Sequence, residues 1–437
     1  MKSDETGDTP VAIVGGGFSG TMTALQLARR GVASVVIDGS GLAGRGVAYS
    51  TTDPAHVLNV PAAKMSAWPD APEHFAGWSG LPGGAFAERR AFGRYLSEQF
   101  AESAVPLVEQ TAAGAERTTN GWRVRLGEGS TLDARALVLA QGNQPPAPLA
   151  VAEGLPPELY VANPWTAEAR AAIARAAERD SDVLIIGTGL TMVDTVLSLV
   201  AAGHRGQITA LSRRGLVPRA HADPAPPPAP VELSEVPLGS VTRLSRWLRR
   251  RSGEVGFRAA VDSLRPHSHA IWQSFDQTEE ARFIRHARPW WDIHRHRIAP
   301  DVAAQLKELI AAGKLRIMAG RLNSLRDEGG EVSATIQRRG DGIVERRFCL
   351  AVNCTGPLGE IARTRDPLLA DLLSRGEVRP DRFGIGLEVD AHDRAGAGLW
   401  ALGPLTKGRY WEMTAVPDIR GQAAAVAEDI SAELARR

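Results

Sequence analysis

Two short apolar runs in the chain each end in a glycine-rich turn and continue into a segment of helical periodicity. The first run, residues 11–14, leads into Gly15-Gly16-Gly17-Phe18-Ser19-Gly20, and the second, residues 183–186, leads into Gly187-Thr188-Gly189-Leu190-Thr191-Met192. A short apolar run bounded by glycine predicts a buried strand, and apolar residues spaced three and four apart predict a helix. The pattern therefore predicts two strand–turn–helix units, about 170 residues apart.

The same pattern predicts the elements around the first unit. Helices are expected over 21–30 and 88–103, and the glycine- and proline-rich stretch 39–70 is too irregular for one element. Short strands are expected at 34–37, 121–124, 132–134 and 136–140. The proline-rich residues 144–148 then predict a crossing between domains.

Around the second unit, a helix is expected over 192–202 and a strand over 207–212. Further on, the pattern predicts a Pro/Ala loop at 223–230, a mainly helical region at 241–297, strands within 315–336 and 347–355, and a last helix after Asp418. We therefore predict an α/β fold with two Rossmann-like dinucleotide-binding domains, in which the second domain is inserted between the halves of a discontinuous first domain. The predicted parts are 1–148 (first domain, first part), 149–345 (second domain, with a helical insertion) and 346–437 (first domain, second part).

Composition limits the class of protein. The 437 residues are 43% hydrophobic and 23% charged, with a net charge of +1 and a mean hydropathy of −0.16. The balanced charge argues against nucleic acid or an anionic membrane as a partner, and no apolar run reaches the roughly 20 residues of a membrane helix. Residues 1–10 lack the basic start and apolar stretch of a secretory signal. We expect a cytoplasmic protein; its oligomeric state cannot be inferred.

The chain has two cysteines, Cys349 and Cys354. Their spacing imitates the redox pair of flavin disulfide reductases. However, residues five apart on the strand predicted at 347–355 point to opposite faces and lie roughly 16 Å apart, whereas a disulfide needs Cα atoms within about 7 Å. We predict that both are core thiols.

The first glycine turn has the chemistry of a dinucleotide site. Gly15 permits a tight turn, Gly17 lets the backbone approach a pyrophosphate, and Gly20 lets the helix pack on the strand. Backbone N–H groups and the helix dipole then hold the phosphates. Asp38, at the end of the next strand, is placed to accept hydrogen bonds from ribose hydroxyls.

The second turn keeps Gly187 and Gly189 but has Met192 in place of the third glycine, which predicts looser packing of helix on strand. After the next strand, Arg213 and Arg214 occupy the place where an acid would favour NAD. Arginine there suits the additional phosphate of NADP, so we favour NADPH over NADH; the alternative is a solvated charged turn.

Several longer segments carry a family resemblance. The chain resembles the FAD- and NAD(P)-binding flavoproteins with two dinucleotide-binding domains, which include flavin-containing, Baeyer–Villiger and N-hydroxylating monooxygenases, and it is most similar to a bacterial group of FAD/NAD(P)-binding proteins. The segments that carry the resemblance are residues 44–49, 58–67, 163–165, 289–297 and 411–420.

The resemblance implies that the first glycine turn holds FAD and the second NAD(P)H. By this implication, 1–148 and 346–437 form a discontinuous FAD-binding domain, and the NAD(P)-binding domain, 149–345, is inserted in it. It further implies that residues 45–49 and 59–65 line the flavin, that 403–405 approach the ribityl chain, and that 414–419 approach the pyrimidine edge. Many relatives have an acid after the glycine of the last strand, whereas this chain has Gly403-Pro404. The predicted cofactor residues are Gly15, Gly17, Phe18, Ser19, Gly20, Asp38, Gly39, Arg45, Val47, Ala48, Asn59, Val60, Met65, Gly142, Gly187, Gly189, Leu190, Thr191, Arg213, Arg214, Gly403, Pro404, Leu405, Thr414, Ala415 and Ile419.

Five histidines and five arginines crowd residues 267–297: His267, His269, His286, His294, His296, Arg282, Arg285, Arg288, Arg295 and Arg297. Surrounding arginines would repel a cation, so no metal site is predicted. An anion-binding face for an NADP phosphate or a substrate carboxylate is favoured; the alternative is a solvated basic helix. Trp290 and Trp291 either stack on a ring or, as we favour, form a buried pair. Glu412 either faces the flavin or caps a turn.

The predicted activity is that of an FAD-dependent, NADPH-using oxidoreductase. We favour a monooxygenase acting on a small polar or amine-bearing substrate. The alternatives are an NAD(P)H-dependent flavin reductase or dehydrogenase without oxygen insertion, and a non-catalytic nucleotide-binding module. No Gly-x-Ser-x-Gly elbow of a hydrolase is present, and no catalytic residue can be assigned.

Overall fold

The computed structural model describes residues 9–436, so most of the stretch considered for a secretory signal lies outside the described residues. The chain divides into two compact units. The first unit comprises residues up to 52, 61–144 and 358 onward, and the second comprises 53–60 and 145–357.

A six-stranded sheet forms the centre of the first unit, in the order β15-β16-β7-β1-β2-β3. All neighbouring strands are parallel except the β15–β16 pair. Every residue of β1, β2 and β7 is buried, which explains their unbroken apolar sequences. The strands are β1 (Val11–Val14), β2 (Ser34–Ile37), β3 (Leu107–Val108), β7 (Ala136–Leu139), β15 (Arg394–Gly396) and β16 (Leu399–Ala401).

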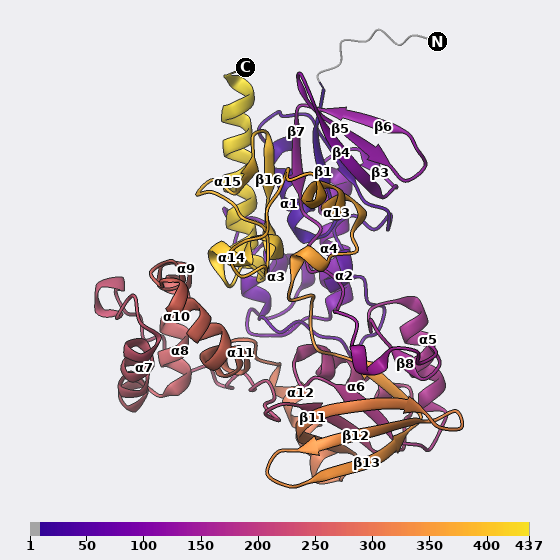
Figure 1. The fold of residues 1–437 in the computed structure, drawn as a ribbon. Helices are drawn as coiled ribbons and strands as arrows, with labels where there is room; N and C mark the ends of the chain where they lie inside the picture. Colours follow the sequence, from indigo (N-terminus) through magenta and orange to yellow (C-terminus); the bar gives the residue numbers. More distant parts are fainter. Residues whose placement is uncertain (1–8, 437) are drawn as a thin grey trace. The chain divides into compact units, whose positions relative to one another are not determined.

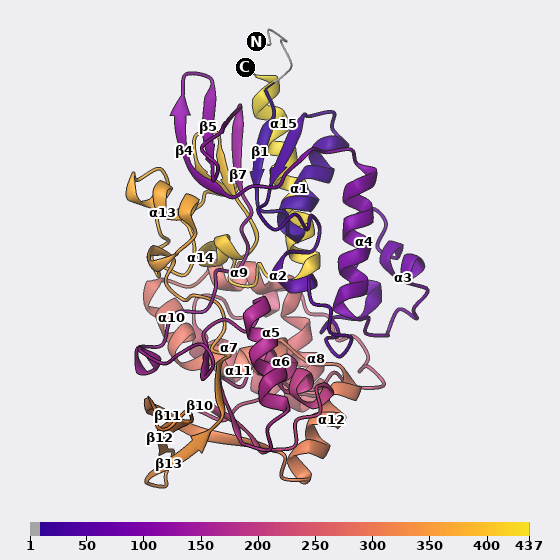
Figure 2. The ribbon, with the colours of Figure 1, turned by 90° about the vertical axis from the view of Figure 1, so that its right-hand side faces the viewer.

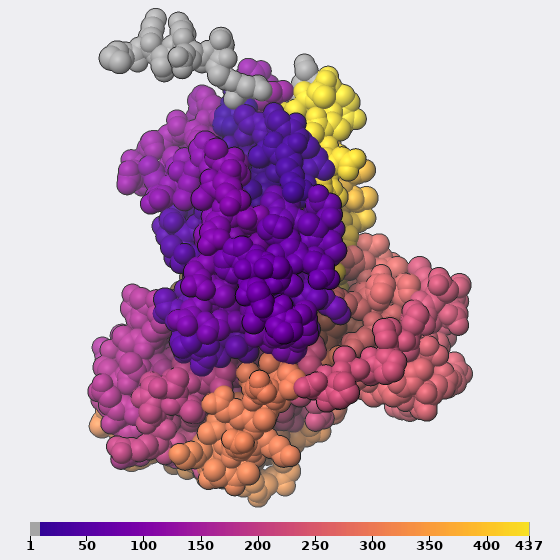
Figure 3. Space-filling view, turned by 180° about the vertical axis from the view of Figure 1, so that it is seen from behind, coloured from indigo at the N-terminus to yellow at the C-terminus, as the bar shows by residue number. Residues whose placement is uncertain are grey.

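Helices pack around this sheet (Figures 1 and 2). The last helix lies along α1, and the space-filling view shows its yellow atoms against the indigo N-terminal part of the same unit (Figure 3). The helices are α1 (Phe18–Ala28), α2 (Gly46–Tyr49), α3 (His74–Ser79), α4 (Arg89–Glu102), α13 (Pro367–Ser374), α14 (Lys407–Tyr410) and α15 (Val416–Ala435), with short 3₁₀ turns η1 (Ala62–Lys64), η6 (Ile361–Arg363) and η7 (Gly403–Thr406).

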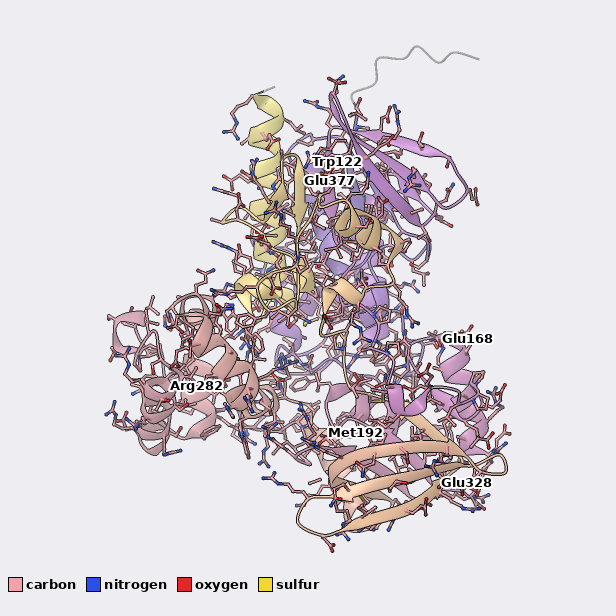
Figure 4. The ribbon with its side chains drawn as sticks, viewed as in Figure 1. Trp122, Glu168, Met192, Arg282, Glu328 and Glu377 are labelled. Carbon is pink, nitrogen blue, oxygen red and sulfur yellow. The ribbon has the colours of Figure 1, made fainter. Side chains whose placement is uncertain are left out.

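A three-stranded antiparallel sheet covers part of the core of the first unit; its strands are β4 (Ala112–Thr118), β5 (Gly121–Leu126) and β6 (Thr131–Ala134). Trp122 of β5 is fully buried and donates from Nε1 to the carbonyl of Gly398 at 2.9 Å. Arg117 lies over the Trp122 ring and pairs with Glu377 at 2.7 Å; Trp122 and Glu377 are labelled in Figure 4. These contacts join the early and late sequence segments of the unit.

The second unit is built on a seven-stranded sheet in the order β13-β12-β11-β10-β9-β14-β8. Its parallel part is β11-β10-β9-β14-β8. Within it, β11-β10-β9-β14 repeats the arrangement β3-β2-β1-β7 of the first unit, with the strand before the glycine turn in the same relative place. The strands are β8 (Tyr160–Val161), β9 (Val183–Ile186), β10 (Ile208–Ser212), β11 (Leu315–Asp327), β12 (Val332–Arg338), β13 (Ile343–Phe348) and β14 (Leu350–Asn353).

Helices of the second unit fall into two sets. The first set belongs to the Rossmann part: α5 (Ala167–Ala177), α6 (Leu190–Ala201) and α12 (Pro300–Ala311), with the 3₁₀ turns η2 (Ala150–Ala152) and η3 (Leu233–Glu235). The second set forms a helical cluster separate from strands β11–β13 (Figure 1): α7 (Val241–Val255), α8 (Phe257–Ser263), η4 (Arg265–His267), α9 (Ser268–Gln273), α10 (Gln277–Arg282), the π-helical turn η5 (Phe283–Ala287) and α11 (Arg288–Arg295).

The predicted α/β class with two Rossmann-like parts is confirmed, and the mainly helical region at 241–297 is found as expected. Several boundaries differ from the predicted ones, and α15 begins at Val416, before the start expected after Asp418. The helices that follow the two glycine turns begin directly after Gly17 and Gly189, at Phe18 and Leu190. Each starts one turn or less before the predicted residue. The single strand predicted at 347–355 is wrong, because the chain bends at Cys349 between β13 and β14, which pair with different neighbours.

No helix within residues 9–436 is both long enough and apolar enough to cross a membrane.

Candidate functional site

The first glycine turn connects β1 directly to α1. Gly15 has φ +106°, and a Cβ atom there would lie 2.5 Å from the carbonyl oxygen of Ala140. A Cβ at Gly20 would lie 1.8 Å from the carbonyl oxygen of Gly15. Gly17 is the N-cap of α1, and no side chain caps the helix. The first N–H groups of α1 are therefore available to an anion, as a pyrophosphate site requires.

Asp38 and the loop after it surround this turn. The Asp38 carboxylate accepts hydrogen bonds from the N–H groups of Gly16 at 2.5 Å and Ser40 at 2.7 Å. Gly44 donates to the carbonyl oxygen of Gly16 at 2.7 Å. A Cβ at Gly46 would lie 2.9 Å from the Cα of Gly17, so two glycines meet where the helix begins. This close approach leaves a cradle of backbone atoms that any side chain would fill.

Gln141 follows β7 at the same edge of the sheet. Its side-chain amide nitrogen and oxygen are both buried and make no hydrogen bond of normal geometry within the described residues, although the amide lies close enough to the Asp366 carboxyl group to favour its charged form. A buried amide without a partner is costly, and a polar ligand group at this edge would satisfy it. The uncapped N-terminus of α1 and the Gln141 amide are thus two polar features at one edge of the sheet, and both fit a dinucleotide. Gly142, the next residue, has φ +68° and open space around its Cα.

A buried polar network supports the turn after β16. Gly403 has φ +67°, and a Cβ there would lie 2.5 Å from Oγ of Ser19. The Gly403 N–H donates to Gln422 at 2.7 Å, and the Gln422 amide donates to Asp393 at 2.8 Å. Burial raises the pKa of Asp393 to about 6. The carboxylate expected after Gly403 is thus absent, but Asp393 lies behind the turn and is connected to it through Gln422.

Asp393→Asn should change how stability depends on pH. The folded pKa of about 6 lies above the ordinary value of 3.8 for this side chain, so the folded state holds a proton that the unfolded chain has released. Stability should therefore fall as pH rises from about 4 to 6 and remain lowered above that. Asparagine tolerates the φ of +61° at this position. The substitution should therefore remove about 2–3 kcal/mol of this pH-dependent loss of unfolding free energy.

Urea unfolding at pH 4.5 and 7.5 tests this prediction, with exposed Asp301→Asn as control. An unchanged difference between the two pH values in the Asp393 variant would contradict the assignment.

The second glycine turn repeats the geometry of the first. Gly187 has φ +118°, and a Cβ there would lie 2.1 Å from the carbonyl oxygen of Cys354. Gly189 is the N-cap of α6, without a side-chain cap, and has open space around it. Met192, labelled in Figure 4, is fully buried in the place of the third glycine. Each turn therefore rests on the chain that follows the neighbouring parallel strand, β7 in the first unit and β14 in the second.

Arg213 and Arg214 follow β10 beside this turn. The Ser212 hydroxyl lies 2.9 Å from Oγ1 of Thr188, which donates to the carbonyl of Leu216, and it accepts from the Gly215 N–H at 3.0 Å. These bonds connect the 212–215 bend to the glycine turn. Arg213 is exposed and Arg214 half-buried. Neither guanidinium has an ion-pair or hydrogen-bond partner within residues 9–436. Both arginines are thus available to an anionic ligand.

The short segment 53–60 belongs to the second unit. His56 is buried, and its Nε2 lies 2.9 Å from Oγ of Ser198 and 3.1 Å from the carbonyl oxygen of Asp194, both on α6. Ser198 donates to Asp53 at 2.6 Å. The Ser198 proton points to a carboxylate and not to the histidine, so this set holds the segment on α6 and does not form an activated nucleophile.

The remaining predicted residues lie in different environments. Phe18 is buried against Phe92, with ring centroids 6.2 Å apart, and Asn59 accepts from His221 at 3.0 Å through its carbonyl. Arg45 donates to Ser97 at 3.2 Å. Exposed positions are Gly39, Val47, Ala48 and Thr414; half-buried positions are Val60, Leu190, Thr191, Pro404 and Ala415; buried positions are Met65, Leu405 and Ile419. Asn59 and Val60 fall in the second unit, and the other predicted flavin-lining residues fall in the first.

The tryptophan prediction is wrong. Trp290 is 52% exposed, and Trp291 is half-buried with its ring 6.5 Å from that of Phe283. The two are adjacent on α11 and therefore point in different directions, so they cannot form one buried pair. Glu412 is buried, one residue after Trp411, whose φ of +57° is uncommon for a non-glycine residue.

The cysteine prediction is confirmed. Cys349 and Cys354 are both buried and free. Burial raises the pKa of Cys349 and raises that of Cys354 to about 12. Since the thiolate is the reactive form, we expect the folded protein to resist thiol reagents at pH 8, with both thiols reacting only after unfolding in denaturant. Rapid modification of either cysteine in the folded protein would contradict this expectation.

Comparison with known proteins agrees with the geometry. Residues 12–144 match the family model described as FAD-NAD(P)-binding. Uncharacterized proteins of Mycobacterium bovis and Mycobacterium tuberculosis are 25% identical over 404 residues, covering 80% of this chain and 74% of theirs.

Among solved structures, an L-lysine 6-monooxygenase from Pseudomonas syringae superposes with a TM-score of 0.66 at 16% identity, covering 97% of this chain and 99% of the other. The ornithine N-hydroxylase of Kutzneria sp. 744 gives 0.65 at 14% identity, covering 98% and 99%. A Lactococcus lactis thioredoxin reductase gives 0.56 at 12% identity, covering 98% and 100%. At these identities, the likeness is one of fold.

Residues 12–144 therefore carry an FAD-NAD(P)-binding domain, and the whole chain has the fold of flavoproteins with two dinucleotide-binding domains. The resemblance inferred from the sequence motifs is confirmed at this level, as is the predicted cofactor class, FAD with NAD(P).

Some residues at these turns were not found from the sequence. Asp393 and Gln422 are separated along the chain from the glycine motifs that they adjoin, and nothing in their local sequence distinguishes them. Gln141 directly follows the strand predicted at 136–140, so its place at the edge of the sheet is visible in the sequence. Thr188 and Ser212 could have been noticed, because each lies at the end of a predicted strand, where parallel sheets gather polar groups.

Proposed function

We propose that the protein is an FAD-dependent, NADPH-using oxidoreductase and, within that class, a monooxygenase acting on a small polar or amine-bearing substrate. The observation that carries the proposal is the pair of glycine turns, each joining a parallel strand to an uncapped helix N-terminus, in two separate sheets. One such turn serves one nucleotide, and two suggest that electrons pass from a nicotinamide to a flavin.

In this proposal the first unit holds FAD. Gly15, Gly17 and Gly20 with the N-terminus of α1 would hold the pyrophosphate, Asp38 the ribose, and the turn at 403–405 the ribityl chain. When bound, the flavin would supply the redox chemistry, and the protein would supply binding, orientation and electrostatics. The second unit would hold NADPH at Gly187 and Gly189. The unpaired Arg213 and Arg214 support a coenzyme with a 2′-phosphate.

Two observations favour a monooxygenase. The L-lysine 6-monooxygenase and the ornithine N-hydroxylase share the fold over nearly the whole chain, and their names indicate amine-bearing substrates. A disulfide reductase is less well supported even though a thioredoxin reductase shares the fold, because both cysteines are buried and held as thiols. A flavin reductase or dehydrogenase that passes electrons to another acceptor is the second candidate.

The test begins with the purified holoprotein under anaerobic conditions. NADPH should bleach the visible flavin band, and readmission of oxygen with an amine substrate should give a hydroxylated product in proportion to the NADPH consumed. Oxygen-independent turnover with a dye or quinone would favour the reductase instead. A colourless protein that takes up no flavin, or a flavin that neither NADPH nor NADH bleaches, would overturn the proposal.

A further inference from the structure

The helical cluster of the second unit contains more arginines than carboxylates. Residues 241–297 contain twelve arginines and six carboxylates, although the whole chain is nearly neutral. Most of these arginines lie on exposed helix faces. One example is Arg282, labelled in Figure 4, which pairs with Glu279 on the same helix. One group differs because it gathers around a single histidine, His294 of α11.

Backbone pairing brings this group together from three parts of the chain. The N–H of Arg219 donates to the carbonyl of Ile293 at 2.9 Å, and the carbonyl of Arg219 accepts from Ile298 at 3.0 Å. Arg219 is therefore held between the end of α11 and the segment after it. His294 and Arg297 are the chain neighbours of the two residues to which Arg219 is bonded.

Helix α8 completes the group. The ring of Phe257, the first residue of α8, lies 4.4 Å from the imidazole of His294 by centroids. Arg258 follows Phe257 in the chain. Asp262, near the end of α8, accepts from Nη1 of Arg297 at 2.8 Å. Arg219, Arg258 and His294 thus meet beside Arg297, whose carboxylate partner is Asp262.

Arg297 is only 6% exposed, and its Nη2 is buried without a hydrogen-bond partner within the described residues. Leaving guanidinium N–H groups unpaired in the interior is costly. Arg219 and Arg258 are exposed, and neither side chain has a partner in the part of the chain that the structure describes. Burial first, and then Arg219, Arg297 and Arg258, lower the pKa of His294. Three guanidinium groups therefore act on the imidazole, and Asp262 is the carboxylate that pairs with one of them.

We propose that Arg219, Arg258, His294 and Arg297 form a binding site for a small oxyanion, a carboxylate or a phosphate. Guanidinium groups bind both anions in bidentate fashion, and an anion here would satisfy Nη2 of Arg297 and relieve the mutual repulsion of the cations. The identity of the ligand rests on the proposed function. If the protein is an NADPH-using oxidoreductase, the anion is either the 2′-phosphate of the coenzyme or an acidic group of the substrate.

Binding of inorganic phosphate to the holoprotein, measured by calorimetry at constant ionic strength, tests the site. Arg219→Gln and Arg258→Gln should each weaken binding by about five- to tenfold. Arg246→Gln removes an exposed arginine of α7 that also lacks a partner within residues 9–436, and it should leave phosphate binding unchanged. Equal effects of all three substitutions, or no saturable binding by the unmodified protein, would overturn the site.

A second readout does not depend on the arginine variants. An anion beside His294 favours the charged imidazole, so phosphate should raise the pKa of His294 in an NMR titration; His294→Asn identifies its signal. A pKa that phosphate does not change would also overturn the proposal.

Repeating the calorimetry with saturating NADP⁺ or NAD⁺ distinguishes the two sources. Loss of phosphate binding with NADP⁺ alone assigns the site to the coenzyme phosphate, whereas retained binding with both coenzymes assigns it to an acidic group of the substrate. These measurements report anion binding and not electron transfer. Their failure is therefore distinct from failure of NADPH to bleach the flavin.

Discussion

Gly20→Ala should yield a protein that does not retain FAD. The added methyl group would lie 1.8 Å from the carbonyl oxygen of Gly15, a backbone atom that cannot move without opening the turn between β1 and α1. The helix N-terminus would then shift away from its place, and the overpacked contact should cost about 1–3 kcal/mol of unfolding free energy. Flavin content after gel filtration, measured from the visible spectrum, tests the expectation.

Variants at two other glycines distinguish loss of FAD binding from loss of stability. A Cβ atom added at Gly77 of α3 would have nothing within 4 Å, so Gly77→Ala should keep both stability and flavin. At Gly17 the nearest atom would be the Cα of Gly46 at 3.5 Å, so Gly17→Ala should fold normally. It should bind FAD more weakly, because a methyl group would be added at the uncapped N-terminus of α1. Full flavin content in Gly20→Ala would rule out this turn as the FAD site.

The second large effect concerns coenzyme choice. Arg213→Ala combined with Arg214→Ala should raise the apparent KM for NADPH far more than that for NADH. Losing charge-assisted hydrogen bonds to a phosphate should cost about 1.5–3 kcal/mol, which corresponds to roughly 10- to 150-fold. Both arginines lie near the second glycine turn without a partner in the described chain, so little structural loss should accompany the change.

Steady-state NADPH and NADH oxidation by the double variant provides the measurement. Arg205→Ala, at an exposed ion pair with Asp180 in the same unit, is a suitable control and should leave both KM values unchanged. Equal increases for the two coenzymes in the double variant would remove the assignment to NADP.

The sequence predicts those parts of the fold in which local pattern and tertiary structure agree. β1 and β2 are found at the predicted residues because every position in them is buried, which an unbroken apolar run reports directly. The starts of α1 and α6 were placed late, because their first turns follow the glycines and are fixed by the turn geometry, not by apolar spacing. β4 was missed because its sequence, Ala112–Thr118, has small and charged residues without a clean alternation.

The sequence predicts those parts of the candidate site whose residues lie close together along the chain. The two glycine turns, Asp38 and the arginine pair follow from short motifs. Asp393 could not be located, because it is brought behind Gly403 only by the pairing of β15 with β16 and by Gln422 of α15. The anion site around His294 likewise needs Arg219, which the chain brings to α11 from more than seventy residues away.

The placement of residues 53–60 has a practical consequence for dissecting the protein. A recombinant fragment covering only 145–357 would lack residues 53–60, among which Asp53 and His56 contact α6, and would expose a surface that the intact chain covers. Conversely, a first-unit fragment made by deleting 145–357 would still contain a loop whose packing partner had been removed. Each half would therefore need its junction redesigned before its behaviour in isolation could be compared with that of the intact polypeptide.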